Sequence, residues 1–445
     1  MMGRVLKKIA TILFLFSFCF LSELKADDVL RLSFQDALQL AQQRQVDVLL
    51  ANERVQQAIA RIAQEKSPLL PKLDGSVSMY RETVNLKSFG INFKVPGFNP
   101  LVPPFNVFDA RISLQQTLFD LSVLRRLKAA KFSETLSFAE KQKAEEDAMA
   151  LVANLYLEAQ RAEESYQYIQ VLQKRDEARL RNAVNQKTLG LGSTIEVTQA
   201  ESNLAQTKNQ VAQAKANKEE RRLDLIAALG LDENQKIQYV SHENFLKMQI
   251  PNDEEIRSQV SNHPDIEVAK KQLDVDTQNK KVEVASYFPK LSASANYGPN
   301  GPHPGDVDDT YAYGGILNIP LYQGGLRKAK VQEASSKIRE SSIQLDQTQK
   351  DKLSQAYSAL ESLKQAKVGV AAAQADFTKS SQELNLAQQK KSIGVGTDLQ
   401  VIEYEAQFAN SKDIQSEAIA TYRLAWVNWV HSLGGMRSWA LGEKK

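Results

Sequence analysis

The sequence has few residues that interrupt helices, and these residues are unevenly placed. All 13 prolines lie before Phe105 or within 251–320. Neither proline nor glycine occurs in 105–189, and the only interruption in 326–393 is Gly369. Because both residue types break helices, and because these stretches are rich in Ala, Gln, Lys, Glu and Leu, the sequence predicts two very long helices.

Cysteine and long apolar runs are also scarce. The single cysteine, Cys19, lies in an apolar run at about residues 9–21, which is too short to span a bilayer as a helix. Basic residues precede this run and Ala26 follows it, which is typical of a secretory signal peptide. The residues before Cys19 do not form a lipobox. We therefore expect residues 1–26 to be a cleaved signal peptide, and the mature protein to have no cysteine and no lipid anchor.

The charge balance and the absence of known motifs argue against nucleic-acid binding, metal binding and enzyme activity. The 56 basic and 53 acidic residues nearly balance, and removal of residues 1–26 leaves equal numbers of each, which gives no support for nucleic-acid binding. The four histidines lack metal-ligand spacing, and no phosphate-binding loop or nucleophile motif stands out. We expect no enzyme activity, no cofactor and no metal. The acidic run Glu145-Glu146-Asp147 is interpreted as a solvated helix face.

The sequence does contain a duplicated turn. The segment Leu189-Gly190-Leu191-Gly192-Ser193 reappears 204 positions later as Ile393-Gly394-Val395-Gly396-Thr397. A glycine that tolerates left-handed backbone ends a helix, and a following Ser or Thr caps the next one. We interpret the two segments as the tips of two helical hairpins.

The elements around the first tip form a first structural repeat, residues 27–230. Ser33 has the character of an N-cap, and alternation of apolar and polar residues marks two strands separated by a loop rich in proline and glycine. The predicted elements are a helix at 34–66, strands at 73–81 and 108–119, a long helix from 121 to the tip, and a return helix ending at Leu229-Gly230.

A second structural repeat, residues 251–434, follows a connector at 231–250. Its predicted elements are a helix ending at about 286, strands at 291–297 and 311–322 with a loop at 298–309, a long helix from 326 to the second tip, and a return helix ending at Leu433-Gly434. Residues 435–445 are predicted to be a C-terminal tail.

Helix lengths suggest how each repeat packs. Each long helix has about 68 residues, or roughly 100 Å at 1.5 Å per residue, and the other helices are about half as long. One long helix can therefore lie beside two short helices stacked end to end, with the strands at one extremity and the tip at the other. Four strands cannot close a membrane barrel, which needs at least eight. Several copies must share a sheet, and two copies would give eight strands, three copies twelve.

In this duplicated order of helix, strand pair, long helix, glycine tip and return helix ending in Leu-Gly, the whole mature chain resembles the TolC-type outer-membrane efflux family. The resemblance implies a mainly α fold with a small β part, in which a homotrimer forms a 12-stranded β-barrel and an α-helical tunnel. It also implies a location in the cell outer membrane of a Gram-negative bacterium, with the helical part in the periplasm.

The same resemblance implies a function and a set of partners. The protein would be the outer-membrane channel component of a tripartite efflux pump or type I secretion system. It would be a passive exit duct, opened on docking of a periplasmic adaptor (membrane fusion) protein, with an inner-membrane pump supplying the energy and outer-membrane lipid around the barrel. The alternative is a non-channel periplasmic coiled-coil adaptor or structural spacer. The cargo stays open.

The resemblance also assigns roles to the hairpin ends. In the family the tips meet the adaptor, and the matching residues here are Gly190, Leu191, Gly192, Ser193, Gly394, Val395, Gly396 and Thr397. The family's tunnel closes near the tips through acidic residues three apart, which align with Gln400 and Glu403, and Glu196 has an equivalent early position in the first return helix. Gly396 or Thr397 stands where the family can have an arginine. The alternative is that Gly190 and Gly394 only form turns, and that Glu196 and Glu403 lie on solvated helix starts.

Overall fold

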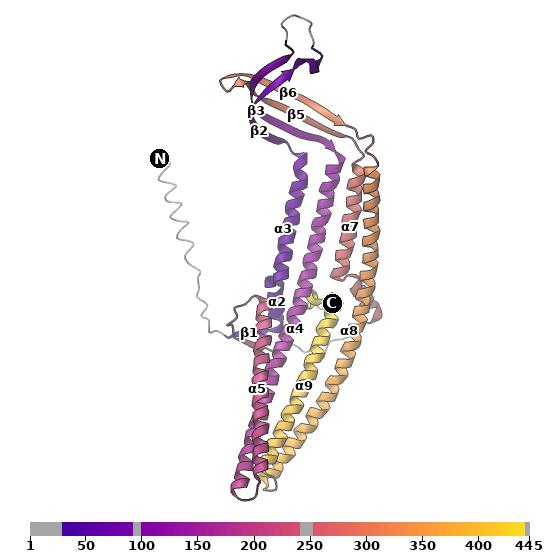
Figure 1. Ribbon diagram of the computed structural model, residues 1–445. Helices are drawn as coiled ribbons and strands as arrows, with labels where there is room; N and C mark the ends of the chain where they lie inside the picture. Colours follow the sequence, from indigo (N-terminus) through magenta and orange to yellow (C-terminus); the bar gives the residue numbers. More distant parts are fainter. Residues whose placement is uncertain (1–28, 92–98, 241–251, 441–445) are drawn as a thin grey trace, which may run out of the picture. The chain divides into compact units, whose positions relative to one another are not determined.

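The computed structural model describes residues 29–91, 99–240 and 252–440 (Figure 1). The expected signal peptide, with Cys19, lies outside the described residues. The chain divides into two compact units, of which unit 1 comprises Met1–Leu49, Glu145–Ile256 and Gln355–Lys445, and unit 2 comprises Leu50–Ala144 and Arg257–Ser354. Among the helices of the described ranges, none is both long and apolar enough to cross a membrane.

Unit 2 holds a four-stranded antiparallel sheet with the spatial order β2-β3-β5-β6 (Figure 1). Its strands are β2 (Lys72–Asn85), β3 (Leu101–Asp120), β5 (Lys290–His303) and β6 (Asp306–Asn318). The helices that lead into and out of the sheet are α3 (Val46–Lys66), the first part of α4 (Leu121–Thr188), α7 (Pro264–Ala285) and the first part of α8 (Leu326–Ser392). The chain thus passes from helix to strand pair and back to helix twice, as the sequence predicts.

The first strand pair extends beyond the predicted strands at 73–81 and 108–119, into a segment that the sequence indicates as a loop. Pro103 and Pro104 misled the prediction because proline cannot donate a ladder hydrogen bond. In the structure they fall at the irregularity where pairing shifts between Glu82 and Val84, so the missing N–H groups break no regular ladder.

The second strand pair differs from the predicted strands at 291–297 and 311–322 for a related reason. Gly298 and Gly301 of the predicted loop at 298–309 belong to β5. A Cβ atom at Gly298 would lie 1.9 Å from the Ala110 carbonyl oxygen. This close backbone approach requires glycine inside the strand. A tight turn replaces the loop, since His303 pairs with Asp306. β6 therefore begins earlier than predicted and ends at Asn318.

Two predicted helices are each divided in two. The helix expected at 34–66 consists of α2 (Phe34–Arg44) and α3, because the side-chain oxygen of Gln45 accepts hydrogen bonds from the N–H groups of Asp47 and Val48, at 2.6 and 3.2 Å, and starts a new helix. The helix expected before 286 consists of α6 (Asp253–Ser261) and α7. There, Pro264 restricts the backbone of the residue before it, and His263 Nδ1 accepts the Asp265 N–H at 3.1 Å.

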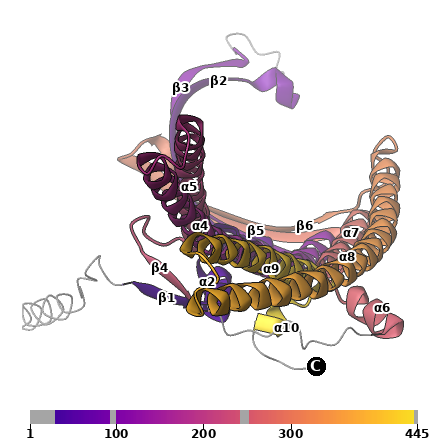
Figure 2. The same cartoon turned by 90° about the horizontal axis from the view of Figure 1, so that it is seen from below.

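Unit 1 contains two helical hairpins and a small parallel sheet. The hairpins are formed by α4 with α5 (Thr194–Leu229) and by α8 with α9 (Asp398–Ser432). Seen from below, α9 lies between α4 and α8 (Figure 2). The rings of Phe377 and Phe408, with centroids 5.2 Å apart, join α8 to α9. An ion pair between Arg161 and Asp413, at 2.7 Å, joins α4 to α9.

The small sheet pairs β1 (Leu30–Ser33) with β4 (Ile237–Val240), which lies in the predicted connector. Neither strand is predicted from the sequence, because each has only four residues. The Tyr156 hydroxyl donates to the carbonyl oxygens of Leu32 and Val240, at 2.9 and 3.2 Å. One buried side chain of α4 therefore holds both strands. The remainder of the connector, 241–250, lies outside the described residues.

The acidic run on α4 is largely buried, so its interpretation as a solvated face is wrong. Glu146 is 3% exposed, and its carboxylate accepts the N–H groups of Met436 and Arg437 at 2.5 and 3.1 Å. These donors begin α10 (Met436–Ala440), a short helix in the predicted C-terminal tail at 435–445. Burial raises the pKa of Glu146, and the two backbone hydrogen bonds only partly oppose this shift.

Candidate functional site

The two hairpin tips share one backbone geometry. Gly190 and Gly394 adopt φ values of 72° and 78°, as predicted for glycines that end helices. At the first tip, the Leu191 N–H donates to the Gln186 carbonyl at 2.8 Å and the Gly190 N–H to the Lys187 carbonyl at 3.0 Å. The second tip repeats this pair of bonds, which satisfies the last carbonyls of each long helix.

The second glycine of each tip has a different physical role. A Cβ atom at Gly192 would lie 3.0 Å from the Lys187 backbone nitrogen, and one at Gly396 would lie 2.9 Å from that of Lys391. The turn therefore passes too close to the end of the preceding helix for a side chain. All four tip glycines are explained by the turn itself.

The apolar residues of the tips have no such local explanation. Leu191 is 80% exposed and Val395 is 75% exposed, and Leu189 and Ile393 beside them are each 73% exposed. Such exposure of neighbouring large apolar side chains at one point of the surface is typical of an interaction site.

Two of the three candidate gate residues cap the return helices. The Glu196 N–H donates to Ser193 Oγ at 3.2 Å, and Glu196 Oε2 accepts the Ser193 N–H at 2.7 Å. Gln400 and Thr397 make the same reciprocal pair at 3.2 Å for both bonds. Glutamate and glutamine are interchangeable in a capping box, which accounts for the glutamine at 400.

The third candidate gate residue joins the two hairpins. Glu403 on α9 lies 3.2 Å from Arg179 Nη2 on α4, with 39% of the arginine and 45% of the glutamate side chain exposed. The sequence analysis missed Arg179, since no pattern relates a residue of one hairpin to a residue of the other. Distance from the tips is the signal that could have found it. Arg179 precedes Gly190 by eleven residues and Glu403 follows Gly394 by nine, so both residues lie about equally far from the tips.

A buried aspartate lies beside this ion pair. Asp176 is 2% exposed, accepts Thr207 Oγ1 at 2.5 Å and Arg175 Nε at 2.8 Å, and lies 3.8 Å from Arg179. Burial alone would raise the pKa of Asp176, but the hydrogen bonds from Arg175 and Thr207 and the charges of Arg175 and Arg179 together leave the pKa below its usual range. The carboxylate is therefore charged and orders the arginines.

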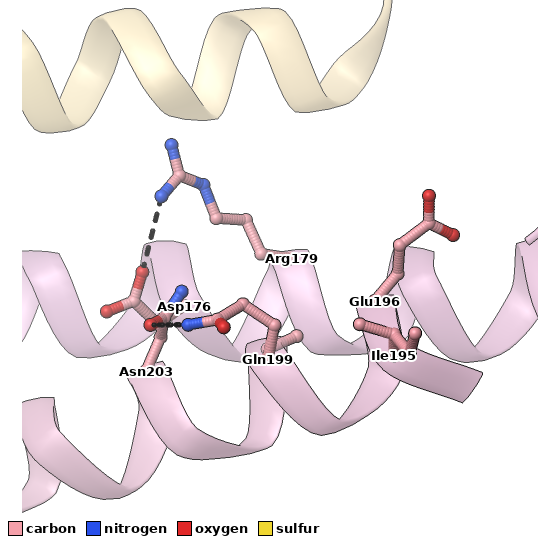
Figure 3. A pocket seen from close by; sticks show the side chains of 7 residues that line it. Asp176, Arg179, Ile195, Glu196, Gln199 and Asn203 are labelled. Atoms are coloured by element: carbon pink, nitrogen blue, oxygen red, sulfur yellow. Dashed lines mark hydrogen bonds and ion pairs between the residues drawn. The ribbon is translucent and has the colours of Figure 1, made fainter. Parts of the chain in front are cut away.

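Asp176 and Arg179 help to line a depression of about 330 Å³ on the first hairpin (Figure 3). Asp176 and Arg179 come from α4, and Glu196, Gln199 and Asn203 come from α5. Arg179 extends away from this pair of helices and towards the ribbon of the neighbouring helix (Figure 3). The depression thus extends from the start of α5, next to the first tip, to Arg179 of the ion pair that links the hairpins.

The second hairpin does not repeat the charged cluster. At the offset of 204 residues, Ser380 and Ser411 stand in place of Asp176 and Thr207 and are 6% and 5% exposed. Glu383 stands in place of Arg179, and its carboxylate accepts Gln407 Nε2 at 3.2 Å. The two tips match in backbone conformation, but the charged cluster of Asp176 and Arg179 is present on the first hairpin and not repeated on the second.

The sheet of unit 2 has one apolar and one polar face. Directly paired residues of an antiparallel sheet point to the same side. One such row crosses all four strands and is apolar throughout: Leu73, Leu114, Ala295 and Tyr313. The row beside it is mostly polar and points to the opposite side: Asp74, Ser113, Asn296 and Ala312.

The apolar face is open to its surroundings. Val77, Met79, Tyr311 and Leu317 on this face are all more than half exposed. On the polar face, Arg111 binds Asp109 and donates to Asn296 Oδ1 at 3.2 Å. The outer strands β2 and β6 each have one neighbour in this sheet. Sheet edges of this kind normally pair with another chain or are covered.

A metal centre is not indicated in the part of the chain that the structure describes. No group of three or more His, Cys, Asp or Glu residues in these ranges could hold a metal ion.

Comparison with known proteins gives a family match and a set of similar folds. The model of the outer membrane efflux protein family matches residues 37–231 and 256–435. No curated protein sequence matches.

Among solved structures, the CmeC outer membrane channel of Campylobacter jejuni has a TM-score of 0.74 at 21% identity, covering 90% of this chain and 85% of that one. The outer membrane protein VceC of Vibrio cholerae has a TM-score of 0.70 at 16% identity, covering 90% and 96%. The open-state MtrE outer membrane channel of Neisseria gonorrhoeae has a TM-score of 0.69 at 18% identity, covering 90% and 89%.

Proposed function

The chain belongs to the outer membrane efflux protein family, and we propose that three copies of it form the passive exit duct of a tripartite efflux pump or type I secretion system. The chain is an outer-membrane channel component, with its helical part in the periplasm. Proteins of this family are trimeric channels that work with pump partners.

The sheet is the observation that carries this proposal. Its exposed apolar face suits lipid, its polar face suits a water-filled lumen, and its strands of 13 to 20 residues are long enough for the apolar band of an outer membrane, about 25 Å tall. Unpaired edges are not tolerated in lipid. We propose that β2 of one copy pairs with β6 of the next, so that three copies close a 12-stranded barrel.

The hairpin tips are the proposed docking points for a periplasmic adaptor. The exposed Leu191 and Val395 supply apolar contact, and the glycine turns keep the backbone narrow. A helical end of the partner can then approach both tips closely. An inner-membrane pump would act through that adaptor.

We propose that the Arg179–Glu403 ion pair helps to hold the gate closed. The pair joins α4 to α9 near the tips, so separation of the two hairpins must break it. Glu196 and Gln400 contribute indirectly, because their capping boxes fix the starts of α5 and α9. Opening would then move whole hairpins while each tip stays folded.

The remaining expectations fit this role. A conduit needs no catalytic group, and we propose no enzymatic reaction and no cofactor for the chain. The alternative function, a periplasmic adaptor or structural spacer, is not favoured, since it has no use for an exposed apolar sheet. We propose no nucleic-acid partner and leave the cargo undefined.

Membrane fractionation with heat-modifiable electrophoresis tests the proposal. The protein should be found in the outer-membrane fraction as a trimer that separates into monomers only on boiling. A monomer in the soluble periplasmic fraction would refute the channel and favour the spacer.

A further inference from the structure

Unit 2 contains a cationic groove where the helices meet the sheet. The groove has a volume of about 520 Å³ and is lined by α4, α7 and α8. Its charged lining residues are Arg125, Lys280 and Lys281, and no acidic residue lines it. In the whole chain basic and acidic residues nearly balance, so three cations around one concavity are a local departure from the average.

These cations lack partners in the described part of the chain. No ion pair or hydrogen bond joins Arg125, Lys280 or Lys281 to another described residue, whereas Arg126 beside them binds Glu65 at 3.2 Å and Lys290 binds Asp120 at 3.0 Å. Three uncompensated positive charges repel one another, and an anion in the groove would relieve that repulsion.

The rest of the lining is apolar. Val284 lies one helical turn after Lys280 on α7, and Phe288 follows shortly after the end of α7 at Ala285. The two side chains are 41% and 47% exposed. Ile338 of α8 completes this side of the groove. The groove therefore offers cations on one side and exposed apolar side chains on the other, which matches an anionic amphiphile better than a free anion.

The groove also lies next to the end of the apolar sheet face. The last row of that face before the helices pairs Phe119 with Leu291 and Leu291 with Leu317. Leu121, two residues after Phe119, lines the groove, and so does Phe288, three residues before Leu291. If the apolar face spans the hydrocarbon, the groove lies at the level of the lipid headgroups on the helical side.

We propose that this groove binds the headgroup of an anionic phospholipid in the periplasmic leaflet of the outer membrane. Lys280, Lys281 and Arg125 contact the phosphate, and Val284, Phe288 and Ile338 contact the first part of an acyl chain. Basic pockets at the membrane boundary bind anionic headgroups in this manner. The proposal rests on the proposed channel function, because it requires the sheet to be in a membrane.

Quenching of a tryptophan in the groove tests the proposal. The full-length Phe288→Trp variant is reconstituted into phosphatidylethanolamine vesicles that carry brominated phosphatidylglycerol or, at equal mole fraction, brominated phosphatidylcholine. The fluorescence of the parent protein, with its own three tryptophans, is subtracted. We expect stronger quenching by the anionic lipid. Val284→Trp is a second reporter if Phe288→Trp yields no trimer.

Matched charge variants separate this site from general attraction to the membrane. Lys280→Gln with Lys281→Gln should reduce the preference for the anionic lipid by roughly fivefold for each lysine. Lys328→Gln with Lys330→Gln, in the first turns of α8 and outside the groove, should preserve it. Equal quenching by both lipids, no quenching by either, or the same loss in both double variants would overturn the proposal.

The proposed channel function is tested first, by measuring trimer formation in the same samples. If the reporter variant forms no heat-modifiable membrane trimer while the parent does, the second reporter is used. If the parent itself forms none, the channel function fails. Trimers without lipid preference contradict only the lipid site.

Discussion

The ion pair between the hairpins gives the sharpest prediction about gating. Glu403→Gln removes the charge that faces Arg179 but leaves the capping boxes of both tips intact. Both side chains are more than one third exposed, so solvent screens the pair, and such a pair contributes roughly 0.2–1 kcal/mol. If three copies open together, the closed state loses about 0.6–3 kcal/mol, which is roughly a 3-fold to 160-fold shift towards the open state.

Single-channel recording in planar bilayers measures this shift. The Glu403→Gln channel should spend a larger fraction of time in conducting states than the parent at low salt. High salt screens exposed charges, so it should raise the open fraction of the parent and change the variant little. This dependence on ionic strength distinguishes loss of an ion pair from a change in packing.

Two further variants complete the experiment. Lys391→Gln removes a 2.7 Å ion pair with Asp398 that lies within the second hairpin alone, and it should leave the open fraction unchanged. Exchange of the charges, Arg179→Glu with Glu403→Arg, should restore closure in part. Equal open fractions for the parent and Glu403→Gln at low salt would refute the assignment of this pair to the gate.

Three other predictions concern the tips and unit 1. Leu191→Asp or Val395→Asp should reduce export at least roughly tenfold, because burial of such a side chain contributes about 1.5–3 kcal/mol, while trimers on gels stay normal; unimpaired transport in both variants would remove the tips from docking. Glu146→Ala should lower the free energy of unfolding by about 1–3 kcal/mol, measured in urea, because the N–H of Met436 loses its acceptor; an unchanged urea midpoint would contradict this. Because the pKa of Asp176 is lowered on folding, its stabilisation is complete above about pH 4 and is lost as the pH falls through the lower folded value; Asp176→Asn should therefore flatten the acid limb of the unfolding profile, and a parallel acid limb in both proteins would count against the charged state.

The long helices were predictable from the sequence because they depend on local rules. Absence of proline and glycine predicts the two long helices, and the structure has them at Leu121–Thr188 and Leu326–Ser392. The strand ends were not predictable in this way. The prolines there lie at a pairing irregularity, and Gly298 is required because its backbone approaches that of Ala110 closely. Both features depend on the partner strand and cannot be recognised within one strand.

In the candidate site, too, features set by neighbouring residues were predicted and contacts between distant residues were not. The backbone of the tips follows from residues within one turn, so the left-handed glycines were predicted correctly. The partner of Glu403 was missed because it lies 224 residues away in the chain. Burial of the run at Glu145 and Glu146 was missed for a similar reason, since the groups that contact it belong to the end of the chain and to α2.

The contacts between α4 and α9 indicate where the hairpins of unit 1 can separate. Far from the tips, Arg161 and Asp413 form a 2.7 Å ion pair in which the side chains are only 18% and 14% exposed, and the Tyr168 hydroxyl donates to Asn410 at 2.8 Å. Near the tips the Arg179–Glu403 pair is longer and more exposed. Arg161 and Arg179 are 18 residues apart on α4, roughly 27 Å along the helix. Since solvent weakens an ion pair, the weaker of these two ion pairs lies at the end that carries the proposed docking residues. We therefore expect a partner that pulls on the tips to break Arg179–Glu403 first, while the Arg161 contacts hold the hairpins together farther from the tips.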